Sequence, residues 1–226
     1  ATMPDRTVVQ WDKEALEEAG VIKIDILGLR MLSAIEDAVT ITEKIHGRRP
    51  DLDALTPDDP EVYAMIQRGE TVGVFQVESR AQASLIPNFR PRSFRDLTIQ
   101  IALIRPGPLQ GNMVRPYLRR RQGQDPVHYA HPRLRQALEE TLGVIVFQEQ
   151  VLKVAHDLAG FTPGEGEQLR RALGNKRAEE AIAGFRARFI GGARANGVPE
   201  HVARQVFEQL QAFGGFSFAK SHAAAF

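Results

Sequence analysis

From residue 133 onward, the apolar residues of this chain recur with the 3.6-residue period of an α-helix. This period predicts helices over 133–139, 147–158, 178–194 and 199–213. Another helix is expected to begin within 162–165, because Thr-Pro-Gly-Glu combines a capping box with a proline at the first helical position. The carboxyl half of the chain is therefore expected to consist almost entirely of packed helices.

The amino-terminal half mixes helical and strand-like patterns. Apolar spacing, with glycine or proline at several ends, predicts helices over 11–19, 29–45, 60–68 and 94–103. Two other segments have the β-branched and aliphatic character of strands, namely 21–27 (VIKIDIL) and 71–79 (TVGVFQVES). The first is expected to be a strand, and the second a strand or a buried extended segment.

The composition is that of an ordinary globular protein, with 43% hydrophobic and 25% charged residues among 226. There is no cysteine, which excludes a disulfide scaffold, a thiolate zinc site and a cysteine nucleophile. The first residues lack the layout of a secretory signal, and no apolar run approaches the ~20 residues of a membrane-spanning helix. We expect a soluble protein with no membrane partner. Both ends run into structured segments, so we also expect a piece of a longer chain.

The segment 21–27 places two opposite charges on one side of an apolar strand. Side chains alternate between the faces of a strand, so Lys23 and Asp25 share a face opposite Ile24 and Ile26. One interpretation is a half-exposed strand whose ion pair faces water. The other is a cleft in which the carboxylate holds a metal ion and the lysine meets an anion. A lone carboxylate is too few for a two-metal phosphoryl-transfer centre, so its partners would have to come from outside this chain.

Arginines are much more frequent than lysines, and they occur in local groups. The guanidinium fork suits phosphate oxygens, although a GC-rich genome also raises the arginine content. Because the formal net charge is only +1, the grouping is more informative than the total. The groups are Arg90 with Arg92 and Arg95, Arg115 with Arg119, Arg120 and Arg121, and Arg170 with Arg171. Each group is a candidate phosphate-binding surface, and a solvated helix face is the simpler alternative.

Residues 214–221 (GGFSFAKS) come close to the phosphate-loop pattern but have Ala219 where that pattern requires glycine. The preceding segment is helical rather than a strand, which also argues against a phosphate-loop NTPase. Lys220, Ser221 and His222 nevertheless fall at the start of a predicted helix, where exposed backbone amides favour anions. A phosphate site of another kind is therefore expected here.

Six segments together carry a family resemblance. They are KIDILGLR (23–30), GVFQVES (73–79), LIRPGPLQ (103–110), FQEQV (147–151), GEGEQLRRALGNK (164–176) and FSFAKSHAAAF (216–226). In this order they resemble blocks of the bacterial C-family DNA polymerases, the family of the DNA polymerase III α subunit, over essentially the whole chain. The error-prone accessory branch is resembled by VVQWDK (8–13), ESRAQ (78–82) and PYLRRRQG (116–123). In contrast, LGLR (27–30) and Lys220 are as in the replicative branch. Of the two branches, the resemblance favours the error-prone one.

The resemblance implies an α+β fold in two parts. Residues 1–30 would form the C-terminal part of a palm domain similar to that of polymerase-β-like nucleotidyltransferases. Residues 31–226 would form a mainly helical fingers domain, incomplete at its C-terminus. The other two catalytic aspartates of the family lie outside this sequence, so the piece alone is expected to be inactive.

The resemblance also implies roles for particular residues. Asp25 resembles a catalytic aspartate that binds metal, in a centre of two Mg²⁺ ions completed by aspartates outside this chain, and Lys23 resembles its neighbour facing the nucleotide. The expected nucleotide-binding residues are Arg105, Arg170, Arg171, Lys220, Ser221 and His222. Separately, the arginine group expected to contact DNA is Arg115, Arg119, Arg120 and Arg121.

The expected function is that of part of a DNA-directed DNA polymerase, which adds deoxynucleotides to a primer 3′ end in replication or error-prone translesion synthesis. Its partners would be primer–template DNA and deoxynucleoside triphosphates. A sliding clamp and other polymerase subunits would bind through regions outside this chain. The polymerase is expected in the cytoplasm, at the nucleoid. One alternative is a non-catalytic helical nucleic-acid-binding module, which leaves the charged face of 21–27 without a purpose. Another is a small-molecule kinase, which rests only on GGFSFAKS.

Overall fold

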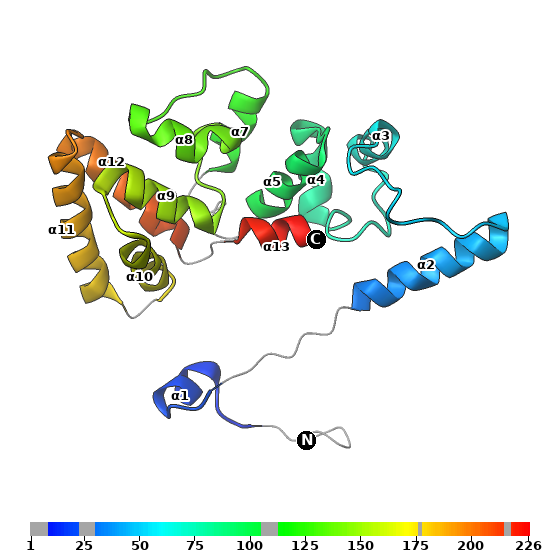
Figure 1. Cartoon of the computed structure of the whole chain (residues 1–226), viewed down its shortest axis with the longest axis horizontal. Helices are drawn as coiled ribbons and strands as arrows, with labels where there is room; N and C mark the ends of the chain where they lie inside the picture. Colours follow the sequence, from blue (N-terminus) through cyan, green and yellow to red (C-terminus); the bar gives the residue numbers. More distant parts are fainter. Residues whose placement is uncertain (1–8, 23–29, 105–112, 176–177, 215–217) are drawn as a thin grey trace. The chain divides into compact units, whose positions relative to one another are not determined.

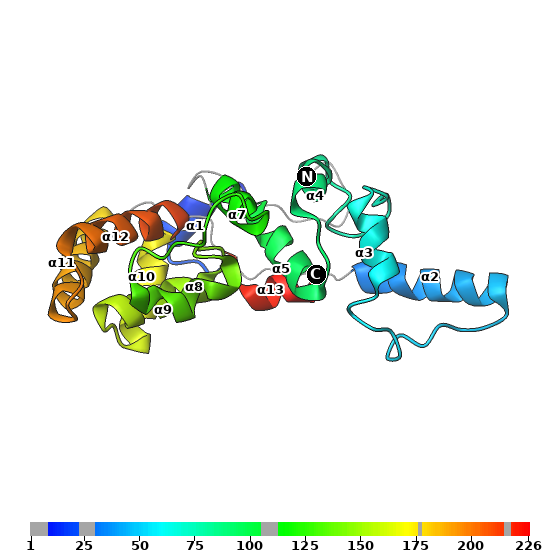
Figure 2. The same cartoon turned by 90° about the horizontal axis from the view of Figure 1, so that it is seen from above.

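The computed structural model describes residues 9–22, 30–104, 113–175, 178–214 and 218–226. The chain divides into two compact units, residues 1–54 and 55–226. Every regular element of the described residues is a helix (Figures 1 and 2). The mainly helical character is thus confirmed for this part of the chain. The strand predicted over 21–27 falls largely within 23–29, outside the described residues, and the domain boundary at residue 30 stays a prediction.

The first unit contains two helices, α1 (Lys13–Glu18) and α2 (Arg30–His46). Each is followed by a glycine with positive φ, +70° at Gly20 and +69° at Gly47. Glycine adopts this left-handed conformation without strain and commonly ends a helix. Both helices lie where the apolar spacing predicts them.

The second unit begins with four helices, α3 (Pro60–Gln67), α4 (Arg80–Phe89), α5 (Phe94–Leu103) and α7 (Val114–Arg121). The first three are capped by side-chain oxygens of Asp59, Ser79 and Ser93, each of which accepts a backbone N–H two or three residues further on. α3 and α5 agree with the predicted helices over 60–68 and 94–103.

Residues 71–79 form turns, so the predicted strand or extended segment was wrong. Val74 N donates to Thr71 O at 3.0 Å, which closes a turn. Gly73 and Gln76 both have positive φ, +78° and +66°, whereas strand residues have strongly negative values. The apolar alternation indicated a strand because it carries no information about these two left-handed positions.

The remaining elements of the second unit form its main helical body. They are η1 (Pro132–Leu134), α8 (Arg135–Leu138), η2 (Glu139–Thr141), α9 (Gln148–Ala159), α10 (Pro163–Leu173), α11 (Glu179–Ala195), α12 (Glu200–Gly214) and α13 (Lys220–Ala225). α9 packs against α10, α11 and α12, and is the shared centre of this body. The helices predicted from residue 133 onward are confirmed, with 133–139 divided into a short α-helix between two 3₁₀ turns.

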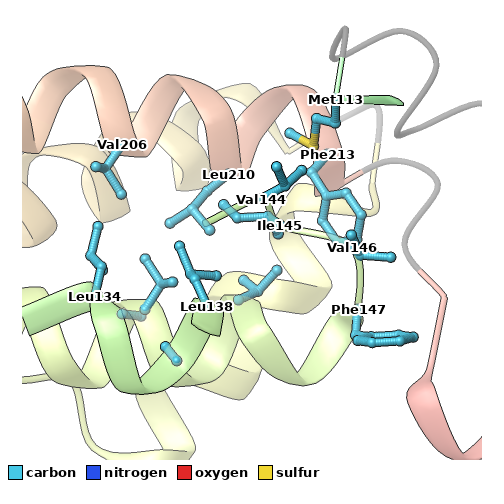
Figure 3. Close-up of a cluster of buried hydrophobic side chains, with 14 of the residues drawn as sticks. Met113, Leu134, Leu138, Val144, Ile145, Val146, Phe147, Val206, Leu210 and Phe213 are labelled. Atoms are coloured by element: carbon cyan, nitrogen blue, oxygen red, sulfur yellow. The ribbon is translucent and has the colours of Figure 1, made fainter. Parts of the chain in front are cut away.

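The core of the second unit forms around the apolar run Val144–Phe147 that leads into α9 (Figure 3). All four residues of this run are buried. Leu138 lies on one side of the cluster and Leu210 of α12 on the other, with their side chains turned toward each other. Burial of such side chains stabilises the fold by about 1.5–3 kcal/mol each, so this run holds η1, α8, α9 and α12 together.

One buried polar side chain ties this apolar run to α8 and η2. Gln150 Oε1 accepts the backbone N–H groups of Val146 and Phe147 at 2.8 and 3.0 Å. Its Nε2 donates to Ala137 O at 3.1 Å and to Thr141 Oγ1 at 2.7 Å. The oxygen and the nitrogen of this buried amide therefore each make two hydrogen bonds, as a buried polar group requires.

The last helix, α13, packs beside α5 and not as a continuation of α12 (Figures 1 and 2). The backbone just before it is fixed to the start of α9, because Gln148 N donates to Phe218 O at 2.9 Å. Residues near the end of the sequence are therefore placed against α5, η2 and the first turn of α9.

Candidate nucleotide and nucleic-acid sites

Lys220, the first residue of α13, is held by two carboxylates. Its Nζ lies 2.6 Å from Oε2 of Glu140 in η2. Its backbone N–H donates to both carboxylate oxygens of Glu149 in α9, at 3.1 and 3.0 Å. The side chain and the backbone of one residue are thus each engaged by an acidic side chain from a distant part of the sequence.

Glu149 also connects Lys220 with α10. Hydrogen bonds to Glu167 raise the pKa of the Arg170 guanidinium, and the negative charge of Glu149 raises it further. Arg170 therefore lies within electrostatic reach of the carboxylate that accepts from Lys220. The charge of Glu149 thus acts on Arg170 of α10, while its carboxylate oxygens accept from the backbone N–H of Lys220.

Arg170 and Arg171 both bind Glu167 one turn earlier on α10. The Arg170 fork donates from Nε at 2.8 Å and from Nη2 at 2.7 Å, and Arg171 Nε donates at 2.9 Å. The hydrogen bonds from Arg170 and then Arg171 lower the pKa of Glu167 to about 2, so Glu167 is ionised at neutral pH. Arg171 is the more exposed of the two arginines.

Ser221 and His222 are exposed in the first turn of α13. The His222 ring lies against Phe218, with centroids 4.8 Å apart, and against Phe226 at 4.5 Å, both in edge-on geometry. Phe226 in turn contacts Phe75 of the 71–79 turns at 5.5 Å. His222 is thus part of an aromatic group beside the lysine.

Three of the four arginines expected to contact DNA line an open pocket of about 550 Å³. Arg119 makes a two-pronged ion pair with Asp125, with distances of 2.7 and 2.8 Å. Arg120 Nη1 donates to Leu142 O at 2.7 Å. Arg115 makes no hydrogen bond within the described part of the chain, and its charge helps to lower the pKa of Asp125, after Arg119 and Arg120. The pocket therefore presents a positively charged wall.

Arg121, the fourth member, is bound by other parts of its own chain. Its guanidinium makes a two-pronged ion pair with Asp96 of α5 at 2.7 and 2.6 Å. It also donates to the carbonyl oxygens of Phe89 at 2.7 Å and Arg90 at 3.1 Å. These contacts lock α7 onto the ends of α4 and α5, so Arg121 has a structural role whatever else it does.

Three predicted site residues lie outside the described residues, namely Lys23 and Asp25 within 23–29 and Arg105 within 105–112. Their roles stay predictions. Among the residues that the structure describes, no group of three His, Asp or Glu side chains gathers in a way that could hold a metal ion. The same part of the chain contains no helix long and apolar enough to cross a membrane.

Sequence reasoning did not identify Glu140, Glu149 and Glu167 as partners of the cations. Glu167 could have been found, because it stands three and four residues before the two arginines, where helix spacing allows ion pairs. The other two could not, because they are far from Lys220 in the sequence and meet it only through the packing of α13.

The family model described as the bacterial DNA polymerase III alpha subunit finger domain matches residues 31–197. Curated relatives align with the whole chain. The error-prone DNA polymerases of Methylococcus capsulatus and Pseudomonas fluorescens are 49% and 47% identical over 226 residues, all of this chain and 22% of each relative. That of Mycobacterium tuberculosis is 49% identical over 227 residues, which cover 21% of it. The chain spans about a fifth of the length of these relatives.

Residues 31–197 thus correspond to a polymerase fingers domain. The chain belongs to the bacterial DNA polymerase III α subunit family. Within that family it resembles error-prone members along its entire length, as the sequence predicts.

Proposed function

We propose that this chain forms the fingers and the end of the palm of a DNA-directed DNA polymerase. The polymerase would extend a primer 3′ end in replication or error-prone translesion synthesis, at the nucleoid in the cytoplasm. The observation that carries the proposal is the placement of Lys220 by the fold. Its backbone N–H donates to Glu149 of α9 at 3.0 Å, and its ammonium lies 2.6 Å from Glu140 of η2. Lysine and arginine cations are suited to the negative charge that a triphosphate brings and that develops during phosphoryl transfer.

Within this proposal, Lys220, Arg170 and Arg171 bind the triphosphate, and Ser221, His222 and Arg105 line the same site. Lys23 faces the nucleotide from an α+β palm of polymerase-β type. Asp25 offers the oxygen ligand that Mg²⁺ prefers, and aspartates from elsewhere in the polymerase would complete the site. Two bound Mg²⁺ ions would activate the primer hydroxyl and stabilise the leaving group. A sliding clamp and other polymerase subunits would bind through regions outside this chain.

The arginine pocket extends the proposal to primer–template DNA. Arg115, Arg119 and Arg120 would contact phosphates of the backbone, where guanidinium groups supply affinity independent of base sequence. A non-catalytic DNA-binding module would use the same pocket but would have no need for cations at α13 and α10.

The test uses a full-length polymerase that contains this chain, in primer extension at varied nucleotide concentration. Lys220→Ala and Arg171→Ala should raise the apparent KM for nucleotide and lower kcat, with little change in affinity for primer–template. Loss of a charge-assisted phosphate contact of about 1.5–3 kcal/mol corresponds to roughly a tenfold to hundredfold fall in kcat/KM for Lys220→Ala. Lys153→Ala is the matched control, because this exposed lysine of α9 makes no hydrogen bond or ion pair within the described residues.

In the same enzyme, Asp25→Asn should abolish extension and leave duplex binding intact, because it removes a metal ligand and no DNA contact. Extension near the wild-type rate would contradict the role of Asp25. Lys220→Ala and Arg171→Ala could instead weaken primer–template binding and leave the KM for nucleotide unchanged. In that case these two residues would contact DNA and not the nucleotide.

A further inference from the structure

Lys220, Arg170 and Arg171, the cations proposed to bind the triphosphate, each form an ion pair with a glutamate of this chain. Arg170 and Arg171 share Glu167, and the Lys220 ammonium is bound to Glu140. The lysine pair is the more informative, because its members are 80 positions apart and lie on different elements. Helix periodicity cannot explain this pair, which forms only in the folded protein.

Glu140 lies in a setting that concentrates positive charge around it. Lys220 Nζ is 2.6 Å from its Oε2, and Arg95 Nη2 of α5 is 3.8 Å from the same atom. The glutamate side chain is only 22% exposed, compared with 46% for the lysine. Its neighbour Thr141 is fully buried, so the backbone that carries Glu140 is fixed in the core.

In this ion pair, the Lys220 side chain lies against the protein. Its Nζ lies 5.8 Å from the centre of the Phe147 ring, the buried residue at the start of α9. The four-carbon stem of a lysine is flexible, so its ammonium takes one position only where a partner holds it. In this structure the ion pair with Glu140 holds the ammonium against the protein, beside the Phe147 ring.

Carboxylate and phosphate oxygens compete for the same ammonium, because both accept charge-assisted hydrogen bonds from it. A triphosphate that reaches Lys220 also brings negative charge close to Glu140, and like charges repel. Nucleotide binding must therefore overcome the ion pair, or at least weaken it.

We propose that Glu140 is a placeholder that holds Lys220 until the nucleotide triphosphate replaces it, and thereby sets the affinity of the site for nucleotide. This inference rests on the proposed role of Lys220. Glu140 itself does not touch the reacting atoms. It acts through the position of the lysine and through its own charge.

The test measures nucleotide binding to a full-length polymerase that contains this chain, in complex with a primer–template whose primer ends in a dideoxynucleotide, so that no chemistry occurs. Glu140→Gln keeps the size of the side chain and removes its charge. The Kd for the correct deoxynucleoside triphosphate should fall about two- to fivefold, the range expected for releasing a partly exposed ion pair. In primer extension with an unblocked primer, KM for nucleotide should fall in parallel with kcat unchanged.

Glu139→Gln is the matched control, because Glu139 is the adjacent, exposed glutamate and its side chain has no hydrogen bond within the described residues. It should leave the Kd unchanged. The gain from Glu140→Gln should also shrink in a Lys220→Ala background, where no lysine remains to be released. Equal gains in both backgrounds would mean that Glu140 acts by repulsion alone and not by holding Lys220, which overturns the proposal.

An unchanged or raised Kd for Glu140→Gln also overturns it, since a raised value would mean that Glu140 positions Lys220 for the nucleotide. Failure of the underlying function looks different. If Lys220→Ala left the nucleotide Kd at the wild-type value, the nucleotide site would be wrongly assigned. If Lys220→Ala weakened binding while Glu140→Gln did not strengthen it, only the placeholder would be wrong.

Discussion

Arg121 shows how much one residue depends on its surroundings. In the sequence it is the last of three consecutive arginines, and nothing distinguishes it from Arg119 or Arg120. In the structure its side chain is only 18% exposed and pairs with Asp96, while its guanidinium lies 4.3 Å from the centre of the Phe89 ring. The planar fork serves the carboxylate, two carbonyl oxygens and an aromatic face at once, which a lysine ammonium cannot do.

We therefore predict that Arg121→Lys lowers the free energy of unfolding by about 2 kcal/mol, because hydrogen bonds to charged groups contribute about 1.5–3 kcal/mol and lysine retains only part of this network. Arg115→Lys, on the exposed side of the same helix, should change it by less than about 0.5 kcal/mol. Urea unfolding followed by circular dichroism measures both. Equal stability of the two variants would mean that the Arg121 contacts contribute nothing.

At the scale of elements, the contact between α9 and α11 depends on a glycine. A Cβ atom added at Gly192 would lie 2.1 Å from the carbonyl oxygen of Ala159, far inside contact distance. The neighbouring Gly191 has open space, with nothing within 4 Å. Of these two adjacent glycines, only Gly192 must lack a side chain for α9 and α11 to pack as they do.

We predict that Gly192→Ala destabilises the protein by about 1–3 kcal/mol through overpacking of backbone against backbone. Gly191→Ala should instead stabilise it by ~0.5–1 kcal/mol, because alanine favours the helix over glycine. Thermal unfolding of the two variants under one set of conditions gives the comparison. A shift of the same sign for both would contradict the close approach of α9 and α11.

Helix ends could be predicted where their signals are local. Thr162 and Glu165 form the expected capping box of α10, with Thr162 N donating to Glu165 Oε2 at 2.8 Å and Glu165 N donating to Thr162 Oγ1 at 3.3 Å. α4 was not predicted, and Pro87 within it is one reason. A proline inside a helix removes a backbone hydrogen bond and its ring clashes with the preceding turn, so it commonly ends the helix. Here α4 continues two residues beyond Pro87, to Phe89.

At the scale of the whole molecule, the small net charge hides an uneven distribution. Most of the arginines that form hydrogen bonds or ion pairs within the described residues do so with acidic side chains, as Arg204 does with Glu200 on α12. Arg115 differs, since it lines the arginine pocket without a hydrogen bond in the described part of the chain. Electrostatic attraction for DNA should be strongest where the cations are not already neutralised.

We predict that Arg115→Gln in the full-length polymerase reduces the slope of log affinity against log salt for primer–template by about 0.9, the value for one lost phosphate contact. Replacing Arg119 and Arg120 as well should reduce it further. Arg204→Gln serves as the control and should leave the slope unchanged. Binding titrations over a range of salt concentrations provide the test, and an unaltered slope for the triple variant would assign these arginines to the solvated surface.

The sequence by itself determined the helices of the carboxyl half, the capped start of α10 and the family, because periodicity, capping residues and motif order are properties of neighbouring residues. It did not determine which charges meet. Lys220 and Glu140 are 80 positions apart and come within 2.6 Å only because α13 packs beside α5 and next to the first turn of α9. The same holds for Arg121, whose partner Asp96 is 25 positions away. Charge pairing across such separations follows from the packing of apolar surfaces, which local sequence signals do not specify.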